Sequence, residues 1–429
     1  MTAAPPTSRG VVADSIERRA GAQAGLFGGA YAGRRVLVTG DTGFKGSWLC
    51  AWLRGLGADV AGYALAPPTT PSLFDLIGLS GEVAHVTGDV RDLAALSAAV
   101  AACRPEIVFH LAAQPLVRPS YDDPRGTFET NVMGVVNLLE AVRVCPSVRA
   151  VVNVTSDKCY ENQETSHAYH EADALGGYDP YSASKGGSEI VSAAYRRSFF
   201  GPGSAVCLAT ARAGNVIGGG DWAADRLVPD CVRAVVAGRE IVVRRPLAVR
   251  PWQHVLEPLS GYLWLGARLL GDGHHYDGAW NFGPAAAGAV PVAEVVGEFI
   301  AAFGSGAWRA AEPVDEHLHE AGLLLLDCVK SREELGWTGV WDTSTAVRRA
   351  AAWYRAWAAG ARDGSARAGS RDRAGSGVGS GSGDRAGSGA ATDPRSALIA
   401  DIDGYVAAAR ARGLRWTQAA LRATGGGPA

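Results

Sequence analysis

The alternation of two kinds of segment constrains the fold of this chain more than any other feature. Short apolar runs typical of buried strands lie at residues 35–39, 59–65, 83–87, 106–112, 149–155 and 204–211. Helical patterns fall between them, at residues 46–56, 92–103, 127–144 and 181–199. Strands that alternate with helices in this way build a parallel sheet with helices on both faces. The sequence therefore predicts an α/β fold with a doubly wound parallel sheet.

A glycine triplet follows the first predicted strand. Gly40, Gly43 and Gly46 have the spacing Gly-x-x-Gly-x-x-Gly and open an apolar helix. Glycines at this point let backbone N–H groups approach a pyrophosphate at the helix N-terminus. The triplet alone is weak evidence in a chain with 56 glycines. Its place between a strand and a helix predicts a Rossmann-type dinucleotide site.

Polar and small residues close several of the other predicted strands. Asp89, Ala112-Ala113-Gln114 and Ser156-Asp157-Lys158 all stand at such carboxyl ends. Ligands of doubly wound sheets bind in the crevice outside these ends. We therefore expect these residues to line one crevice together with Gly40.

Two residue pairs in this predicted crevice carry chemistry. Tyr181 and Lys185 are four residues apart and share one face of a helix, where the ammonium favours the phenolate and makes a base. Asp157 and Lys158 add a possible acid and a second possible base. Either pair could also be incidental, as a surface helix pair or a solvated pair at a strand end. Their coexistence in the order seen predicts a reaction with more than one proton transfer.

Composition restricts the partners. The chain has 429 residues, 47% of them hydrophobic, and a formal net charge of −2 without a basic stripe. This balance argues against nucleic acid or an anionic membrane as partner and favours small molecules. Seven widely spaced cysteines without a C-x-x-C read as reduced residues of a cytoplasmic protein, and we expect no metal site. No run approaches the roughly 18 apolar residues of a membrane span.

Longer motifs narrow the interpretation. The chain resembles the extended short-chain dehydrogenase/reductase family, through the glycine triplet, residues 88–92, His110-Leu111-Ala112-Ala113, Asn131 and the Tyr181/Lys185 pair. Within that family it is similar to the CDP-glucose 4,6-dehydratases. That narrower likeness rests on residues 43–48, 114–118, 156–162, 176–181, 214–222 and 250–255, and above all on Lys158, where related dTDP-glucose enzymes carry Glu.

The resemblance implies an enzyme that uses NAD to convert CDP-glucose to its 4-keto-6-deoxy product with loss of water. It implies that Tyr181 is the base of the oxidation, that Lys185 holds the nicotinamide ribose and lowers the pKa of Tyr181, and that Ser156 binds the 4-oxygen. Lys158 would abstract the C5 proton and Asp157, kept protonated, would donate to the leaving 6-hydroxyl. Residues expected to hold NAD, besides Tyr181 and Lys185, are Gly40, Thr42, Gly43, Phe44, Lys45, Gly46, Asp89, Val90, Leu111, Ala112, Ala113, Gln114 and Asn131. Residues expected to bind the nucleotide sugar are Gln114, Arg118, Asn215 and Arg250.

The same reasoning divides the chain. We expect a flexible tail at 1–33, an NAD-binding domain at 34–212 to which later segments contribute, and mainly a nucleotide-sugar-binding lobe at 213–362. Residues 363–392 are almost wholly Gly, Ser, Ala, Arg and Asp, and are expected to form a disordered insertion. Residues 393–429 are expected to contain a helix followed by a tail. A homodimer or higher homo-oligomer is expected from the family.

Three points stay open at this level. Asp41 stands in the glycine loop and is expected to bring a carboxylate close to the phosphates. No acid closes the second strand at Tyr63-Ala64-Leu65, so the choice between NAD and NADP is not visible. The alternatives are a sister dehydratase or epimerase acting on dTDP-glucose or GDP-mannose, and a non-catalytic dinucleotide-binding protein.

Overall fold

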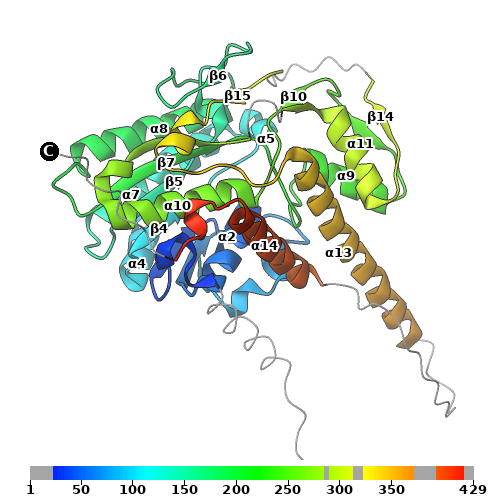
Figure 1. The fold of residues 1–429 in the computed structure, drawn as a ribbon, viewed down its shortest axis with the longest axis horizontal. Coiled ribbons are helices and arrows are strands. Elements are labelled where there is room, and N and C mark those ends of the chain that lie inside the picture. Colours follow the sequence, from blue (N-terminus) through cyan, green and yellow to red (C-terminus); the bar gives the residue numbers. More distant parts are fainter. Residues whose placement is uncertain (1–22, 285–288, 313–321, 372–392, 420–429) are drawn as a thin grey trace, which may run out of the picture.

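A seven-stranded sheet organises the molecule, as seen in a computed structural model that describes residues 23–284, 289–312, 322–371 and 393–419 (Figure 1). Every strand pair in the sheet is parallel, and the strand order is β12-β7-β5-β4-β1-β2-β3. The strands are β1 (Arg35–Thr39), β2 (Asp59–Ala64), β3 (Ala84–Thr87), β4 (Ile107–His110), β5 (Ala150–Val154), β7 (Cys207–Ala213) and β12 (Gly278–Phe282). The order reverses between β1 and β4, which is where a doubly wound sheet binds its ligand. The predicted fold class is confirmed.

Helices cover both faces of the sheet because the strands are apolar on both sides. Val36 and Val38 face one hydrophobic core, and Leu37 faces a second core. The first core is completed by α2 (Phe44–Gly55), α10 (Leu256–Asp272) and α14 (Pro394–Ala411), and the second by α4 (Leu93–Cys103), α7 (Gly134–Arg143) and α8 (Pro180–Ser198).

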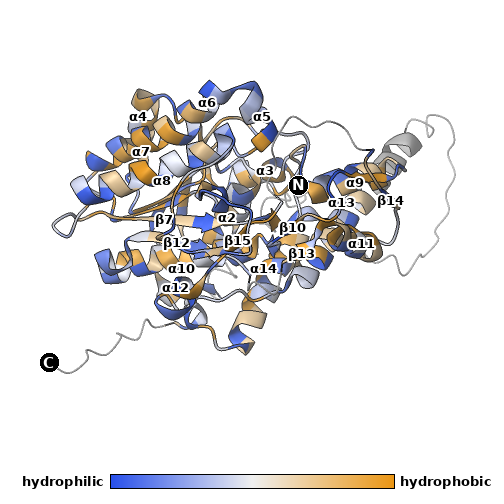
Figure 2. Ribbon diagram, turned by 90° about the horizontal axis from the view of Figure 1, so that it is seen from above, coloured by the Kyte–Doolittle hydropathy of each residue, from blue (hydrophilic) through white to orange (hydrophobic). Residues whose placement is uncertain are grey.

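A smaller lobe stands beside the sheet domain in Figure 1 and Figure 2. It contains α9 (Leu227–Val236), β9 (Ile241–Val243), β10 (Val249–Arg250), β13 (Val290–Pro291), α11 (Val292–Phe303), β14 (Trp308–Ala310) and α13 (Thr343–Arg371). The remaining short elements are η1 (Leu26–Gly29), α3 (Leu73–Leu76), η2 (Leu79–Gly81), α5 (Val117–Asp122), α6 (Pro124–Phe128), η3 (Glu129–Met133), η4 (Asp157–Cys159), β6 (Ala168–Tyr169), β8 (Val216–Ile217), β11 (Gln253–His254), η5 (Gly273–Tyr276), β15 (Leu325–Leu326), α12 (Val329–Glu333) and η7 (Arg415–Thr417). Within the described residues, no helix is both long and apolar enough to cross a membrane.

The expected division of the chain needs two corrections. Residues 23–33 are not a tail, since Phe27 is fully buried and the Tyr31 hydroxyl donates to the carbonyl of Leu263 at 2.5 Å. Later segments were expected to contribute to the NAD-binding domain, and α10 and β12 are such segments, since both return from the second half to the main sheet domain. Helix α13 continues to Arg371 and so enters the expected insertion, of which residues 372–392 lie outside the described part, as do 1–22 and 420–429.

The C-terminal segment closes the first core. Trp416 is fully buried, with its ring stacked on Phe27 at 5.1 Å and on Tyr405 at 5.9 Å. Truncating a buried Trp to Ala removes transfer free energy and leaves a cavity, a loss of about 3–5 kcal/mol. We therefore expect Trp416→Ala to lower the free energy of unfolding by about that amount in urea titrations. Trp308→Ala is the control, because Trp308 is 36% exposed on β14; equal losses in the two variants would contradict the docking of this segment.

Candidate functional site

The glycine loop has the geometry of a phosphate cradle. Gly40 has φ +76°, and a Cβ there would lie 2.7 Å from the amide nitrogen of Ala112. A Cβ on Gly46 would lie 2.0 Å from the carbonyl oxygen of Gly40, so only glycine lets the loop fold this tightly. Helix α2 begins directly after Gly43 and has no side chain capping its N-terminus. Its first backbone N–H groups and the positive end of its dipole are therefore available to a pyrophosphate, which fits NAD.

Asp41 does not bring its carboxylate to the phosphates, contrary to the expectation from sequence. The side chain is fully buried below the loop, with Oδ2 2.7 Å from Nδ1 of His85 on β3. A Cβ on Gly62 would collide with this carboxylate, so Gly62 of β2 makes the room for it. Burial raises the pKa of Asp41, and His85 partly offsets that increase. The Asp41 carboxylate is thus paired with His85 in the protein interior.

The loop after β4 is held from behind by Asn131. The Asn131 carboxamide accepts from the backbone N–H of Gln114 at 2.8 Å and donates to the Gln114 carbonyl at 3.0 Å and to Ser184 Oγ at 2.8 Å. Asn131 lies in the π-helical turn η3, a feature frequent at functional sites. The Gln114 side-chain amide donates to the Leu116 carbonyl and to Thr127 Oγ1, and its oxygen accepts from the Leu116 N–H. Asn131 and the Gln114 side chain therefore shape the crevice wall.

The other expected cofactor residues have distinct surroundings. Asp89 forms a forked ion pair with Arg91, whose hydrogen bonds lower the pKa of the Asp89 carboxyl. Val90 is buried against Gly134. Thr42 Oγ1 donates to the carbonyl of Leu65 at 2.9 Å and so joins the loop to the end of β2. Leu111, Ala112 and Ala113 follow β4 directly, and the N–H of Leu111 and of Ala112 both point to Thr39 Oγ1.

Tyr181 and Lys185 lie side by side in the first turns of α8. Asp179 caps this helix by accepting from the Ser182 N–H at 3.0 Å, with Pro180 in its first turn, and Ser120 Oγ accepts from the Tyr181 N–H at 3.1 Å. Burial raises the pKa of Tyr181 to about 12, partly offset by hydrogen bonding with Ser156. Tyr181 alone is thus a poor base until a cation and a bound cofactor act on it.

A cation that the sequence did not indicate, Arg226, acts on Tyr181. Lys185 points its Nζ to the Val154 carbonyl at 3.4 Å, and burial lowers the pKa of Lys185 to about 8. It is Arg226, bound to Asp221 at 2.9 Å, whose charge lowers the pKa of Tyr181 in this structure. Sequence reasoning missed Arg226, although Asp221 belongs to one of the motifs that carry the family resemblance. The effect of Lys185 on Tyr181 stays a prediction for the cofactor-bound protein.

The segment Ser156-Asp157-Lys158 forms the short turn η4 at the end of β5. Ser156 Oγ donates to Asp157 Oδ1 at 3.0 Å and accepts from the Lys158 N–H at 3.2 Å. Asp157 is 4% exposed, and burial raises its pKa against the opposing charges of Lys158, Lys45 and Arg250. A raised pKa is what an acid that donates a proton near neutral pH requires.

Lysine is rare in this chain, and its distribution marks the site. Of 41 Lys and Arg residues, only Lys45, Lys158, Lys185 and Lys330 are lysine. Lys158 and Lys45 both act on Asp157, and Lys45 also interacts with Lys185. Burial, with Arg226 and Lys185, lowers the pKa of Lys45 to about 7. Burial can bring the pKa of a lysine near neutrality, as for Lys45 and Lys185, whereas a guanidinium stays protonated, and three of the four lysines lie in this crevice.

The residues expected to bind substrate are only partly brought together. Arg250 is 8% exposed, its charge acts on Asp157, and its Nη1 donates to the Gly322 carbonyl at 2.7 Å. Gly214, next to Asn215, makes room for Asp157, since a Cβ there would lie 3.1 Å from Asp157 Oδ2. Arg118 lies 3.9 Å from Asp225, one residue before Arg226. Sequence reasoning also missed Tyr262 of α10, which is fully buried and electrostatically coupled to Asp157 and Tyr181.

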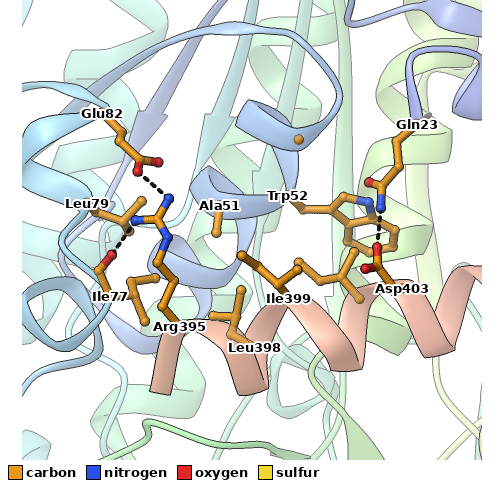
Figure 3. A pocket seen from close by; sticks show the side chains of 12 residues that line it. Gln23, Ala51, Trp52, Ile77, Leu79, Glu82, Arg395, Leu398, Ile399 and Asp403 are labelled. Carbon is orange, nitrogen blue, oxygen red and sulfur yellow. Dashed lines mark hydrogen bonds and ion pairs between the residues drawn. The ribbon is translucent and has the colours of Figure 1, made fainter. Parts of the chain in front are cut away.

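Two other features lie outside this crevice. Cys207, His274 and Asp277 are close enough to hold a metal, but His274 already bonds Asp277 Oδ2 through Nδ1 and the Ser204 carbonyl through Nε2. A small pocket lies against the second half of α2 and is lined by α14 (Figure 3). Ion pairing of Arg395 with Glu82 and a bond of Gln23 to Asp403 hold its two ends. These contacts dock α14 on α2.

Comparisons with known proteins agree with this geometry. The family model described as GDP-mannose 4,6 dehydratase matches residues 37–268. The chain is 48% identical over 334 residues to a CDP-glucose 4,6-dehydratase of Salmonella typhimurium, covering 77% of this chain and 93% of the relative. A dTDP-glucose 4,6-dehydratase of Streptomyces antibioticus is 29% identical over 337 residues, covering 75% and 92%.

A solved structure extends the agreement to the fold. The dTDP-glucose 4,6-dehydratase from Streptomyces venezuelae, solved with NAD bound, aligns with a TM-score of 0.63 at 26% identity, covering 75% of this chain and 97% of that one. The chain therefore belongs to the nucleotide-sugar 4,6-dehydratases, NAD-dependent enzymes of the extended short-chain dehydrogenase/reductase family.

Proposed function

We propose that this enzyme is a CDP-glucose 4,6-dehydratase, which converts CDP-D-glucose to CDP-4-dehydro-6-deoxy-D-glucose and water. The observation that carries the proposal is the Asp157-Lys158 pair on η4, beside Tyr181 and Lys185 of α8. Its likeness to the Salmonella enzyme, at 48% identity, supports CDP-glucose as substrate. NAD, when bound, takes the hydride from C4 of the sugar and returns it to C6.

Tyr181 and its neighbours serve the oxidation. Tyr181 removes the proton of the 4-hydroxyl, and Ser156 hydrogen-bonds the same oxygen. Arg226 already lowers the pKa of Tyr181, which is still raised to about 12 by burial. Lys185 would hold the nicotinamide ribose, and its ammonium beside the phenol, together with the bound cofactor, would lower the pKa of Tyr181 towards the working range.

Asp157 and Lys158 serve the elimination. Once C4 is a ketone, the C5 hydrogen is acidic and Lys158 abstracts it. Asp157 donates its proton to the departing 6-hydroxyl, which leaves as water. Burial raises the pKa of Asp157, a shift towards the protonated carboxyl that this step requires.

The binding residues are assigned on the same basis. The α2 N-terminus and the backbone of residues 40–46 would hold the pyrophosphate of NAD, with Asp89, Val90 and residues 111–114 as walls and Asn131 behind them. Arg250 would bind the nucleotide diphosphate, and Asn215, Arg118 and Gln114 would contact the sugar. Turnover of CDP-, dTDP- and UDP-glucose and GDP-mannose, measured by 4-ketosugar formation, tests the assignment. We expect only CDP-glucose to react well. If another nucleotide sugar reacts better, the enzyme is a sister dehydratase or epimerase. If none gives a 4-ketosugar, the chain is a non-catalytic dinucleotide-binding protein.

Lys45 gives the cofactor site a proton-linked signature. Its folded-state pKa of about 7 means that much of it is neutral at pH 8 in the free enzyme. An anion favours the ammonium form, so NAD binding raises the pKa of Lys45 and takes up protons above pH 7. We expect calorimetry at pH 8, in buffers of different ionisation enthalpy, to show proton uptake that falls in Lys45→Met. Equal uptake in the variant and the parent would remove Lys45 from the phosphate site.

The enzyme is also proposed to be a cytoplasmic homodimer. Phe128, Met133, Ile190 and Phe199 expose large apolar side chains on α6, η3, α8 and the residue after α8, elements that pack side by side. Such patches mark protein interfaces, and sedimentation equilibrium measures the resulting mass. All seven cysteines lie in the described residues as free thiols, which suits a reducing compartment.

A further inference from the structure

Two buried side chains flank the turn that carries Asp157 and Lys158. Thr155 directly precedes Ser156 and is 6% exposed, and Tyr160 follows Cys159 and is 1% exposed. Both side chains are buried in the interior. Thr155 bonds Glu189 of α8 and Tyr160 bonds Arg212 of β7, and these two charged residues pair with each other.

Glu189 and Arg212 form the centre of this network. Arg212 Nη2 lies 2.7 Å from Glu189 Oε2, and each side chain is only 3% exposed. Glu189 also accepts from Thr155 Oγ1 at 2.5 Å and from Thr210 Oγ1 at 2.7 Å. Burial alone would raise the pKa of Glu189, but Arg212 and the two hydroxyls lower it overall. The carboxylate is thus fully charged and fixes Thr155 from the helix side.

The other end of the turn is fixed by Tyr160. Arg212 Nη1 donates to Tyr160 Oη at 2.8 Å, and the guanidinium carbon lies 4.8 Å from the centre of the Tyr160 ring. Tyr160 in turn donates to Asn281 Oδ1 of β12 at 2.8 Å. Asn281 is fully buried and donates to the Tyr169 and Asp327 carbonyls, both at 2.9 Å. The turn η4 is therefore held on both sides, by the hydrogen bonds of Thr155 before it and of Tyr160 after it.

Tyr181 and Lys185 are positioned by different contacts. The N-terminus of α8 is held by Asp179 and Ser120, and Ser184 is bonded to Asn131. None of these groups bonds Thr155, Tyr160 or Arg212 among the hydrogen bonds of the described residues. Glu189 belongs to α8, so this helix carries both the oxidation pair and one end of the network, but the start of α8 and the two ends of the turn have contacts of their own.

We propose that Thr155, Glu189, Arg212, Tyr160 and Asn281 form a clamp that positions Asp157 and Lys158 for the elimination step. These are positioning residues, since they act through the turn η4, and the inference rests on the roles given to Asp157 and Lys158 above. Loosening the clamp slows removal of the C5 proton while the oxidation at C4 continues. The enzyme then stalls with the sugar as its 4-ketone and the nicotinamide reduced.

Tyr160→Phe and Thr155→Val test the clamp, because each removes one hydroxyl and keeps the shape of the side chain. Thr210→Val is the matched control: its hydroxyl bonds the same Glu189 from β7 but lies outside the catalytic turn. Single-turnover absorbance of reduced nicotinamide, steady-state rates, NAD affinity and melting temperature are measured for all three. We expect Tyr160→Phe and Thr155→Val to form product about 10- to 100-fold more slowly, with reduced nicotinamide accumulating and NAD affinity unchanged.

The outcomes separate the clamp from general stability. Accumulation in Thr210→Val as large as in the other two variants overturns the clamp, as does slow product formation without accumulation. If Tyr160→Phe fails to fold, Thr155→Val carries the test from the other end of the turn. Failure of the proposed function itself appears differently, as an absence of 4-ketosugar in the parent enzyme.

Discussion

Lys158→Met should bind NAD and fold like the parent but form product about 1,000-fold more slowly, because removing a general base costs about 10²- to 10⁴-fold in rate. Without Lys158, the C5 proton has no acceptor. The oxidation at C4 depends on Tyr181 and continues, so reduced nicotinamide should build up in one turnover. Product formation and absorbance of the reduced cofactor measure the two halves in one experiment.

Lys158→Arg sharpens this test. The guanidinium keeps the positive charge beside Asp157 but stays protonated at any working pH, so it cannot take a proton. If Lys158 acts only as a charge that tunes Asp157, the arginine variant should retain most activity; if it is the base, both variants should stall. Lys330→Met is the matched control, since Lys330 is a partly buried lysine whose Nζ donates to the Ala279 carbonyl at 2.8 Å, outside the crevice. Turnover of either Lys158 variant within tenfold of the parent would exclude Lys158 as the base.

The sheet was largely accessible from sequence because its signals are local. Six strands were expected within a few residues of their observed places, since each is a short apolar run between a turn and a helix. Helix α10 was missed because it is buried nearly all round, so Leu256–Asp272 shows no polar face to give a helical period. The strand β12 was missed with it. Both belong to the sheet domain through contacts far apart in sequence, which no local pattern reveals.

The residues of the site were also predictable from the sequence only in part. Tyr181, Lys185 and the residues at strand ends were expected in one crevice because a parallel sheet brings all its carboxyl ends to one edge. The direction in which a side chain points could not be predicted from the sequence. Asp41 turns into the interior because Gly62 leaves a space there and His85 supplies a partner from β3. Arg226 reaches Tyr181 from a loop some 45 positions away, and only the folded chain shows it.

The supports of the two pairs explain how one crevice runs two kinds of chemistry. The oxidation pair lies on a capped helix, and the elimination pair lies on a turn fixed by a buried ion pair. Glu189 of that ion pair belongs to α8, so the two pairs are joined through this helix. The cap of α8 at Asp179 does not involve Thr155 or Tyr160, so a variant at either end of the turn should loosen the elimination pair and leave the start of α8 in place.

Tyr181→Phe should act on the opposite half of the reaction from Lys158→Met. Without the phenol oxygen nothing removes the 4-hydroxyl proton, and the rate should fall by about 10²- to 10⁴-fold. Because the ketone never forms, C5 stays non-acidic, so the variant should show neither reduced nicotinamide nor exchange of solvent deuterium into C5. Tyr178→Phe is the control, since Tyr178 lies three residues earlier and is 78% exposed.

The isotope at C4 then distinguishes the two variants in the same sample. With substrate deuterated at C4, the parent should deliver that deuterium to C6 of the product, because the hydride leaves and returns within one active site. Lys158→Met should hold the deuterium on the cofactor, and Tyr181→Phe should leave it on unreacted substrate. These three destinations follow from one geometry, in which Tyr181 and Lys158 act in sequence on adjacent carbons. Deuterium released in free reduced cofactor by the parent would instead make the enzyme a simple dehydrogenase, and Asp157 and Lys158 would have no step to serve.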